Sequence, residues 1–221
     1  VYLHLLLPAD LVSDLSRITE SWKDFRSPNT EEGKRWEDFE TDWSRRQLKF
    51  LEFVDSIHDT GQPTLHFFHS MLPHASWKYL PSGRLYTLYE RPGVKGVIGP
   101  NNVGEDVNRW RDDDWLVTQG HQRHLLQIGF VDKLLGVFVS KLKEPGVYNS
   151  SLIVITADHG ASFRANDSRR SVTKTNYADI MSIPLFIKAP YQKEGVTNDR
   201  NVETIDILPT VADVLDIPFP W

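Results

Sequence analysis

The fold class of this chain is decided by one stretch, Leu152-Ile153-Val154-Ile155-Thr156-Ala157-Asp158-His159-Gly160. A short apolar run that ends at a glycine turn predicts a buried parallel strand. In open α/β sheets, catalytic and ligand-binding groups gather at the carboxyl ends of such strands. Gly160 can adopt a positive φ, which would let the backbone turn sharply after the strand. The stretch therefore predicts a functional loop at the end of a sheet strand.

Asp158 and His159 place a carboxylate oxygen beside an imidazole nitrogen. These donors suit a divalent cation in a hydrolytic or phosphoryl-transfer site. The simpler interpretation is an ordinary turn, in which the aspartate accepts a hydrogen bond from the following backbone. The two residues alone leave both interpretations open.

Composition narrows the class of protein. The 221 residues are enough for a single α/β domain, and 25 basic against 30 acidic residues give a net charge of −5. Because there is no long basic run, a nucleic-acid partner is not expected. The absence of Cys excludes disulfides, cysteine-based zinc sites and a cysteine nucleophile within the chain. A start at Val1 without an initiator Met leads us to expect a segment of a longer protein.

The remaining pattern predicts a layered α/β arrangement. Apolar runs at 65–72, 152–156 and 184–188 predict strands of one mainly parallel sheet, flanked by a helix over 121–143. Further helices are expected over 31–58 and from about residue 204. Residues 75–120 show no sustained period, which is typical of a long functional loop or lid.

His74 ends the strand predicted over 65–72, as Asp158 and His159 end the next one. A lone histidine at a strand end is more often a packed or hydrogen-bonded residue than a ligand. Two parallel strands that both end in such residues favour a binding site, because their carboxyl ends share one edge of the sheet. We therefore expect these three side chains to converge on one cleft.

Five blocks together resemble the C-terminal half of sulfatase-family enzymes in the alkaline phosphatase superfamily. They are residues 72–74, 127–136, 152–160, 183–187 and 202–210. The likeness covers residues 60–217 and is greatest to sulfatase-like proteins of bacterial membranes, related to lipoteichoic acid synthases and phosphoethanolamine transferases. It implies an alkaline phosphatase/sulfatase-like α/β sandwich with a mainly parallel sheet flanked by helices. Residues 1–221 would be a partial domain, with a helical region at 1–59, a core at 60–217 and the loop at 75–120.

The resemblance also implies a site. Asp158 and His159 would be ligands of a catalytic divalent cation, with Ca²⁺, Mn²⁺, Mg²⁺ and Zn²⁺ as candidates. His74 would touch the sulfuryl or phosphoryl oxygens or protonate the leaving group. Lys174 lies roughly where sulfatases keep a lysine that contacts the transferred group, although the surrounding glycine pattern is absent. The alternatives are Arg164, Arg169 and Arg170, whose other interpretation is a solvated basic loop.

The chain departs from the family at the nucleophile. Family members use a Cys-derived formylglycine, Ser or Thr near the N-terminal end of the fold, beside an Asp or Glu that also binds the metal. This chain has no Cys and no Ser-x-Pro-x-Arg pattern. We therefore expect the nucleophile and the N-terminal part of the fold to lie upstream of Val1.

Three functions are consistent with the resemblance. The first is metal-dependent hydrolysis of sulfate esters; the second is transfer of phosphoglycerol or phosphoethanolamine in the cell envelope. The third is a non-catalytic domain that binds an envelope polymer. The expected partner is a sulfated or phosphorylated small molecule, glycan or lipid. The expected location is the bacterial cell membrane, with the domain facing the periplasm or exterior and membrane contact made by segments outside this chain.

Overall fold

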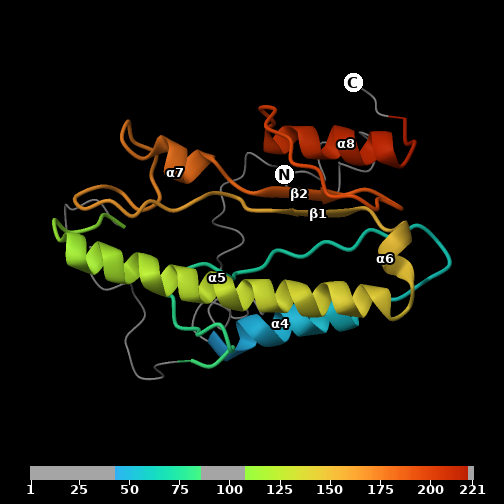
Figure 1. Cartoon of the computed structure of the whole chain (residues 1–221), viewed down its shortest axis with the longest axis horizontal. Helices are drawn as coiled ribbons and strands as arrows, with labels where there is room; N and C mark the ends of the chain where they lie inside the picture. The colour runs from blue at the N-terminus through green and yellow to red at the C-terminus, as the bar shows by residue number, and fades with distance from the viewer. Residues whose placement is uncertain (1–42, 86–107, 219–221) are drawn as a thin grey trace, which may run out of the picture. The chain divides into compact units, whose positions relative to one another are not determined.

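The computed structural model describes residues 43–85 and 108–218. The chain divides into two compact units, 1–49 and 50–221, and nearly all described residues belong to the second. In the described ranges, helices come first, and strands and helices alternate from residue 153 onward (Figure 1). In chain order the elements are α4 (Trp43–Asp55), α5 (Asp114–Lys143), α6 (Val147–Ser150), β1 (Ile153–Thr156), α7 (Tyr177–Met181), β2 (Leu185–Lys188), η2 (Thr204–Asp206) and α8 (Ile207–Val214).

The predicted helices are present, with shifted bounds. The helix expected over 31–58 is observed as α4, and residues 31–42 lie outside the described part of the chain. The helix expected over 121–143 begins earlier, at Asp114, within the range assigned to the long loop. Of that loop, residues 86–107 lie outside the described part. The C-terminal helix begins near residue 204, as predicted, with η2 leading into α8.

Both ends of helix α5 carry residues that typically stabilise helix ends. The Asp113 carboxylate accepts a hydrogen bond from the backbone N–H of Leu116 at 3.0 Å, which caps the first turn. Lys141 and Lys143 lie in the last turn, where positive charge opposes the negative end of the helix dipole. In the described ranges, no helix combines the length and apolar character that crossing a membrane requires.

The larger buried cluster fixes the chain just before His74. Its members are Phe50, Val54, Leu72, Tyr79, Phe130 and Leu134. The rings of Tyr79 and Phe130 stack with their centroids 4.8 Å apart. Burying a side chain such as Leu72 contributes about 1.5–3 kcal/mol, so the segment that leads to His74 is anchored by packing.

A second, aromatic cluster joins the segments that follow His74 and His159. We use "aromatic cluster" for Trp77, Trp110, His124 and Phe163. The Phe163 ring lies 5.3 Å from the Trp77 ring and 5.2 Å from the His124 ring. The Trp110 indole N–H donates to the carbonyl of Ser162 at 2.8 Å. This cluster therefore ties together two segments that are distant in sequence.

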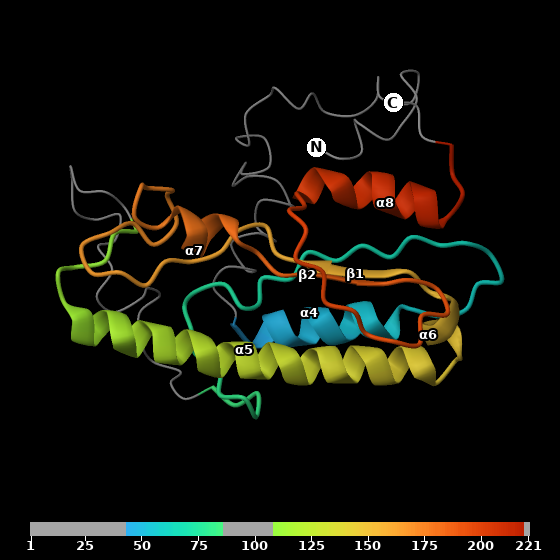
Figure 2. The same ribbon diagram turned by 45° about the horizontal axis from the view of Figure 1, so that its top comes forward.

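The prediction of a mainly parallel sheet is wrong for the described residues. β1 and β2 pair antiparallel, with Ile153 opposite Lys188 and Thr156 opposite Leu185. Residues 65–72 are extended but are not assigned as a strand. Within the described residues the sheet therefore has two strands, β1 and β2. In both views α8 lies on one side of this pair and α5 on the other (Figures 1 and 2).

The connection between the strands explains the antiparallel direction. It contains one short helix, α7, which is held at the end of β1 because the Gly160 N–H donates to the Ile180 carbonyl at 2.7 Å. The Thr156 hydroxyl donates to the Pro184 carbonyl at 3.0 Å, which brings the start of β2 to the same place. The chain thus re-enters the sheet at the end where it left, whereas a parallel pair needs a crossover to the opposite end.

Candidate active site

Asp158 and His159 follow the end of β1 and interact with each other. The His159 backbone N–H donates to Asp158 Oδ1 at 2.9 Å, and Asp158 Oδ2 lies 3.7 Å from His159 Nε2. The first contact is the turn bond expected from the simpler interpretation of this stretch. The second brings a carboxylate oxygen next to an imidazole nitrogen. The two interpretations are therefore compatible, because one turn produces both contacts.

The rings of His74 and His159 are held in the same way. Nδ1 of His74 lies 2.7 Å from the carbonyl oxygen of Ala75, and Nδ1 of His159 lies 2.7 Å from that of Gly160. A carbonyl oxygen only accepts hydrogen bonds, so Nδ1 carries the proton in both rings. In the neutral ring, Nε2 is then an acceptor, the state in which imidazole binds a metal ion or takes up a proton.

Arg170 joins the two rings. Its Nη2 lies 2.8 Å from His159 Nε2, and its Nη1 lies 3.4 Å from His74 Nε2. A guanidinium only donates, so both contacts use the acceptor nitrogens described above. The first distance is that of an ordinary hydrogen bond and the second is long and weak. Arg170 therefore brings His74 and the Asp158–His159 turn together, although residues 65–72, which lead to His74, are not a strand of the sheet.

The loop that carries Arg170 is held by a buried amide. Asn176 is 0% exposed. Its Nδ2 donates to the carbonyls of Ser168 at 2.8 Å and Ser171 at 3.1 Å, and its Oδ1 accepts from the Thr173 N–H at 2.7 Å. Because these bonds hold the backbone on both sides of Arg170, they restrict where its guanidinium can reach.

Arg169 has a different environment from its neighbour. It is 6% exposed, its guanidinium carbon lies 5.9 Å from the Trp77 ring, and its Nη2 donates to Asn108 Oδ1 at 3.1 Å. Burial, and secondly the charge of Arg170, lower the pKa of Arg169 to about 10. Arg169 is still charged at neutral pH, and it packs against the aromatic cluster.

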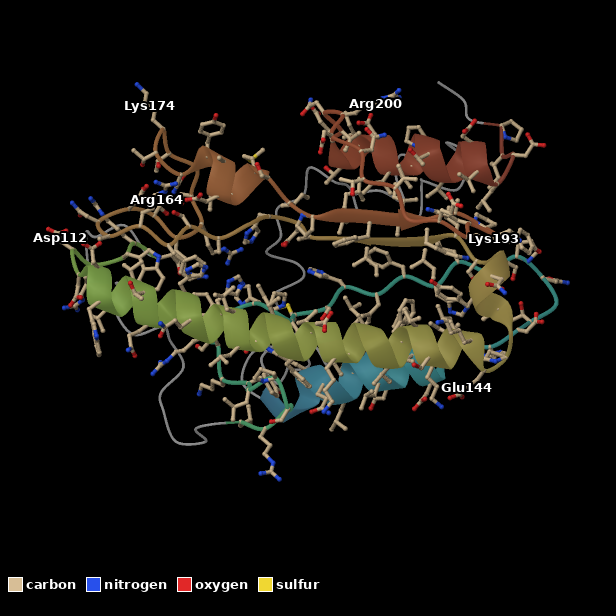
Figure 3. The ribbon with its side chains drawn as sticks, viewed as in Figure 1. Asp112, Glu144, Arg164, Lys174, Lys193 and Arg200 are labelled. Atoms are coloured by element: carbon tan, nitrogen blue, oxygen red, sulfur yellow. The ribbon has the colours of Figure 1, made fainter. Side chains whose placement is uncertain are left out.

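The other two basic candidates, Arg164 and Lys174, lie on the loop between β1 and α7 (Figure 3). Arg164 forms a bidentate ion pair with Asp179 of α7, at 2.7 and 3.2 Å. The hydrogen bond from Arg164 is the main cause that lowers the pKa of the Asp179 carboxyl. Lys174 is exposed, and its side chain points outward from the loop before α7. Among these four basic residues, Arg170 is the one with hydrogen bonds to the site histidines.

The donors at this site fit a divalent cation in kind but not in number. Asp158 offers carboxylate oxygens and His159 offers the acceptor Nε2, which hard and borderline cations bind. Over residues 43–85 and 108–218, no three His, Cys, Asp or Glu side chains are grouped so that they could hold a metal ion. Asp158 and His159 alone therefore offer fewer donors than the roughly six that a hard divalent cation prefers.

Sequence reasoning missed Gln127 and did not single out Arg170. Gln127 is fully buried on the face of α5 that also carries Phe130 and Leu134. A polar residue where the helical period requires an apolar one is a signal that was present in the sequence. No comparable signal distinguishes Arg170 from Arg169, because the path of the loop decides which of them reaches the histidines.

A guanidinium beside two imidazoles beyond the end of a strand can donate hydrogen bonds to an anionic group. The chain belongs to the sulfatase family of hydrolases, in the alkaline phosphatase superfamily: the sulfatase family model matches residues 20–217. This confirms the family that the five sequence blocks predicted. Membership also implies an alkaline phosphatase-like α/β fold.

Several sulfatases and a synthase are similar to parts of this chain. The ulvan-active sulfatase of Formosa agariphila is 27% identical over 126 residues, which cover 56% of this chain and 23% of that protein. The endo-4-O-sulfatase of Bacteroides thetaiotaomicron is 23% identical over 173 residues, which cover 76% of this chain and 32% of that protein. Lipoteichoic acid synthase 1 of Bacillus subtilis is 33% identical over 88 residues, which cover 37% of this chain and 14% of that protein. The chain thus spans less than half the length of these relatives.

Proposed function

We propose that residues 1–221 belong to a sulfatase-like enzyme that hydrolyses sulfate esters with a divalent cation. One observation carries the proposal: the guanidinium of Arg170 meets Nε2 of both His74 and His159. The negative charge of a sulfate ester is spread over its oxygens, which accept hydrogen bonds from a guanidinium or from a protonated imidazole. Arg170 therefore brings two guanidinium donors beside His74 and His159.

In this proposal Asp158 and His159 hold the cation, which would supply positive charge near the reacting oxygen and lower the pKa of the nucleophile. Nε2 is the His159 atom available for this, because Nδ1 is bonded to the Gly160 carbonyl. In the structure the same Nε2 accepts from Arg170. One lone pair cannot serve both partners, so Arg170 has to release His159 when the cation binds. Its donors then become available for substrate oxygens.

His74 is proposed to contact the sulfuryl oxygens or to protonate the leaving oxygen. Its Nδ1 is occupied by the Ala75 carbonyl, so any proton that His74 gives or takes moves at Nε2. That nitrogen faces Arg170. The proton-transfer atom and the anion-binding group thus lie on the same side of the ring.

Arg170 is our first choice for the basic residue that contacts the transferred group. Its planar fork can donate two parallel hydrogen bonds to two oxygens, which a lysine ammonium cannot do. Lys174, which the family pattern favours, remains the second choice, because its side chain points outward.

For the protein as a whole we propose the organisation expected from the sequence. Residues 60–217 form the sulfatase-like core, 1–59 a helical region and 75–120 a loop or lid, and the nucleophile lies outside residues 1–221. We propose a place at the bacterial cell membrane, facing the periplasm or exterior. The proposed substrates are sulfated or phosphorylated glycans, lipids or small molecules, in line with the sulfatases named above.

A second candidate function has its own support. Lipoteichoic acid synthase 1 matches part of the chain at 33% identity, higher than the two sulfatases described above. The same site would then transfer phosphoglycerol or phosphoethanolamine to an envelope acceptor. The third alternative, a non-catalytic domain that binds an envelope polymer, has no particular contact in its favour.

Assays of the full-length protein on an aryl sulfate and on a phosphodiester separate these functions. Turnover of the sulfate supports the first, turnover of the phosphodiester the second, and neither, together with polymer binding, the third. Replacing Arg170 by Ala should lower kcat/KM on the order of 10²–10³-fold, the usual effect of losing one donor to a developing anion. The matched variant is Lys174→Ala. A larger loss in Lys174→Ala than in Arg170→Ala would reverse the assignment.

A further inference from the structure

Gln127 of α5 uses its whole amide to hold the backbone around His74. Its Nε2 donates to the carbonyl of Pro73 at 3.0 Å and to that of His74 at 2.9 Å. Its Oε1 accepts from the backbone N–H of Lys78 at 3.1 Å, with a longer contact from that of Tyr79 at 3.5 Å. The side chain is 0% exposed, so water does not compete for these bonds.

The partners fix which way the amide faces. Two carbonyls lie on one side of Gln127 and two N–H groups on the other, so only the observed orientation pairs donors with acceptors. Leucine has a similar size but has neither the hydrogen-bond donor nor the acceptor of the amide. An ionised glutamate would keep the acceptor and direct its second oxygen at two carbonyls. The position therefore requires a neutral side chain that both donates and accepts.

The bond to the His74 carbonyl completes a clamp on that residue. The His74 backbone N–H donates to the Met71 carbonyl at 2.8 Å, so both backbone polar groups of His74 are bonded. The Ala75 carbonyl that sets the ring's tautomer belongs to the next peptide unit. A shift of the Pro73–His74 backbone would therefore move both the ring and its Nδ1 partner.

We propose that Gln127 is a positioning residue that places His74 Nε2 toward Arg170 and the transferred group. The proposal rests on the function proposed above, in which His74 acts at the substrate. Gln127 itself touches only backbone around His74 and acts through it. The other histidine of the site is held independently, because the backbone after His159 is bonded to α7 through Gly160 and Ile180.

The first test is a double-mutant cycle in the full-length protein, read as kcat/KM on the aryl sulfate. Gln127→Leu should lower kcat/KM on the order of 10–100-fold, as loss of a positioning contact typically does. In a His74→Ala background the same substitution should cost little more, since the residue it positions is already gone. Gln122→Leu, an exposed position on the same helix, is the matched control. Equal losses with and without His74 would overturn the proposal.

The second test does not depend on turnover. Ring ¹⁵N NMR of the full-length protein should show the His74 signals shifted in Gln127→Leu while those of His159 stay in place. Unchanged His74 signals, or equal shifts in both rings, would overturn the proposal. If the protein lacks esterase activity the proposed function fails, and the NMR still decides the role of Gln127. If Gln127→Leu does not fold, Gln127→Met, which keeps an unbranched, neutral side chain of similar size, is subject to the same two outcomes.

Discussion

At the scale of single residues, Gly160 is required for a reason that differs from the expected one. Its φ is not positive, so the turn does not depend on left-handed backbone. A Cβ at this position would instead lie 2.0 Å from the carbonyl oxygen of Asp179. The glycine lets α7 approach closely enough for the bond from the Gly160 N–H to Ile180. The residue after the Asp158–His159 pair thus holds the loop connection against the site.

Replacing Gly160 by Ala should destabilise the fold by about 1–3 kcal/mol, the usual cost of forcing a side chain into a packed position. The contact is with backbone, so no flexible side chain can move aside. Gly136→Ala is the control, because a Cβ there meets nothing within 4 Å and alanine favours a helix. Urea unfolding of both variants measures the difference. Equal stability of the two would show that α7 can move away at no cost.

A second prediction concerns pH. Burial, and next the charges of His121 and Arg169, lower the pKa of His124 to about 4 from an ordinary 6.5. As pH falls below 6.5 the unfolded chain takes up this proton first, so stability should decline from pH 6.5 down to about 4 and level off below. The loss should be about 1–2 kcal/mol, reduced because the ring is partly exposed.

The free energy of unfolding is measured at pH 7.5 and at pH 5 for the parent protein and for His124→Phe. The change between the two pH values is then compared between the two proteins. The phenylalanine keeps a ring against Phe163 and Trp77 but cannot titrate. His66→Gln, at an exposed position, controls for the loss of any histidine. The same pH dependence in the parent and in His124→Phe would contradict the assignment.

At the scale of elements, the sequence predicted where β1 and β2 lie to within one residue at each end, but not how they pair. An apolar run records burial, whereas strand direction depends on the connection. Here a five-residue helix fixed at Gly160 returns the chain to the same end of the sheet. For the site, too, the sequence predicted which residues come together but not how the strands beside them are arranged. His74 meets His159 as predicted, through Arg170, but residues 65–72 are not a strand, so the strand-end rule predicted the residues and not their arrangement.

The partners of the two buried amides, Gln127 and Asn176, could not be predicted for a related reason. Gln127 bonds backbone groups 48 to 54 residues away, and nothing in the local sequence names those partners. Asn176 bonds groups nearer in sequence, but only after the loop has folded back on itself. Pattern reasoning therefore finds the ends of elements and misses the side chains that hold irregular backbone in place.

Replacing Asn176 by Ala should cost about 1–3 kcal/mol, because three backbone groups lose a buried partner. The loop that carries Arg170 should loosen, and trypsin should cut after Arg169 or Arg170 faster than in the parent protein. Asn201→Ala, an exposed asparagine, is the control. Unchanged cleavage in Asn176→Ala would mean that other contacts hold the loop.

At the scale of the molecule, residues 65–72 run extended and expose apolar side chains. Leu65 and Phe67 are 85% and 81% exposed in residues 65–72, although Leu72 at the end of the segment is buried. The matched relatives are longer, since this chain covers at most 32% of those described above. We expect further strands of the family's fold to pair with this segment in the full-length protein. Under the proposed function, the nucleophile and further metal ligands lie outside residues 1–221.

Residues 1–221 alone should accordingly be catalytically silent and bind metal weakly. Asp158 and His159 provide two ligands, whereas a hard divalent cation prefers roughly six donors. Calorimetry with Mn²⁺, Mg²⁺, Ca²⁺ and Zn²⁺, paired with sulfatase and phosphodiesterase assays, measures both properties. The full-length protein should bind the metal tightly and turn over substrate. Asp158→Asn should abolish both metal binding and turnover there, and Asp199→Asn, at an exposed position, is the control. Tight stoichiometric binding and turnover by residues 1–221 would place the active site elsewhere.

The bonds from His74 and His159 to the carbonyl of the following residue have a consequence for how such a site can be transferred. Each imidazole draws its tautomer from its own dipeptide, Ala75 in one case and Gly160 in the other. No remote carboxylate has to evolve, or be designed, to set the proton on the ring. A protein engineer who grafts either dipeptide with its local backbone conformation onto another scaffold should therefore carry over an Nε2 acceptor together with it.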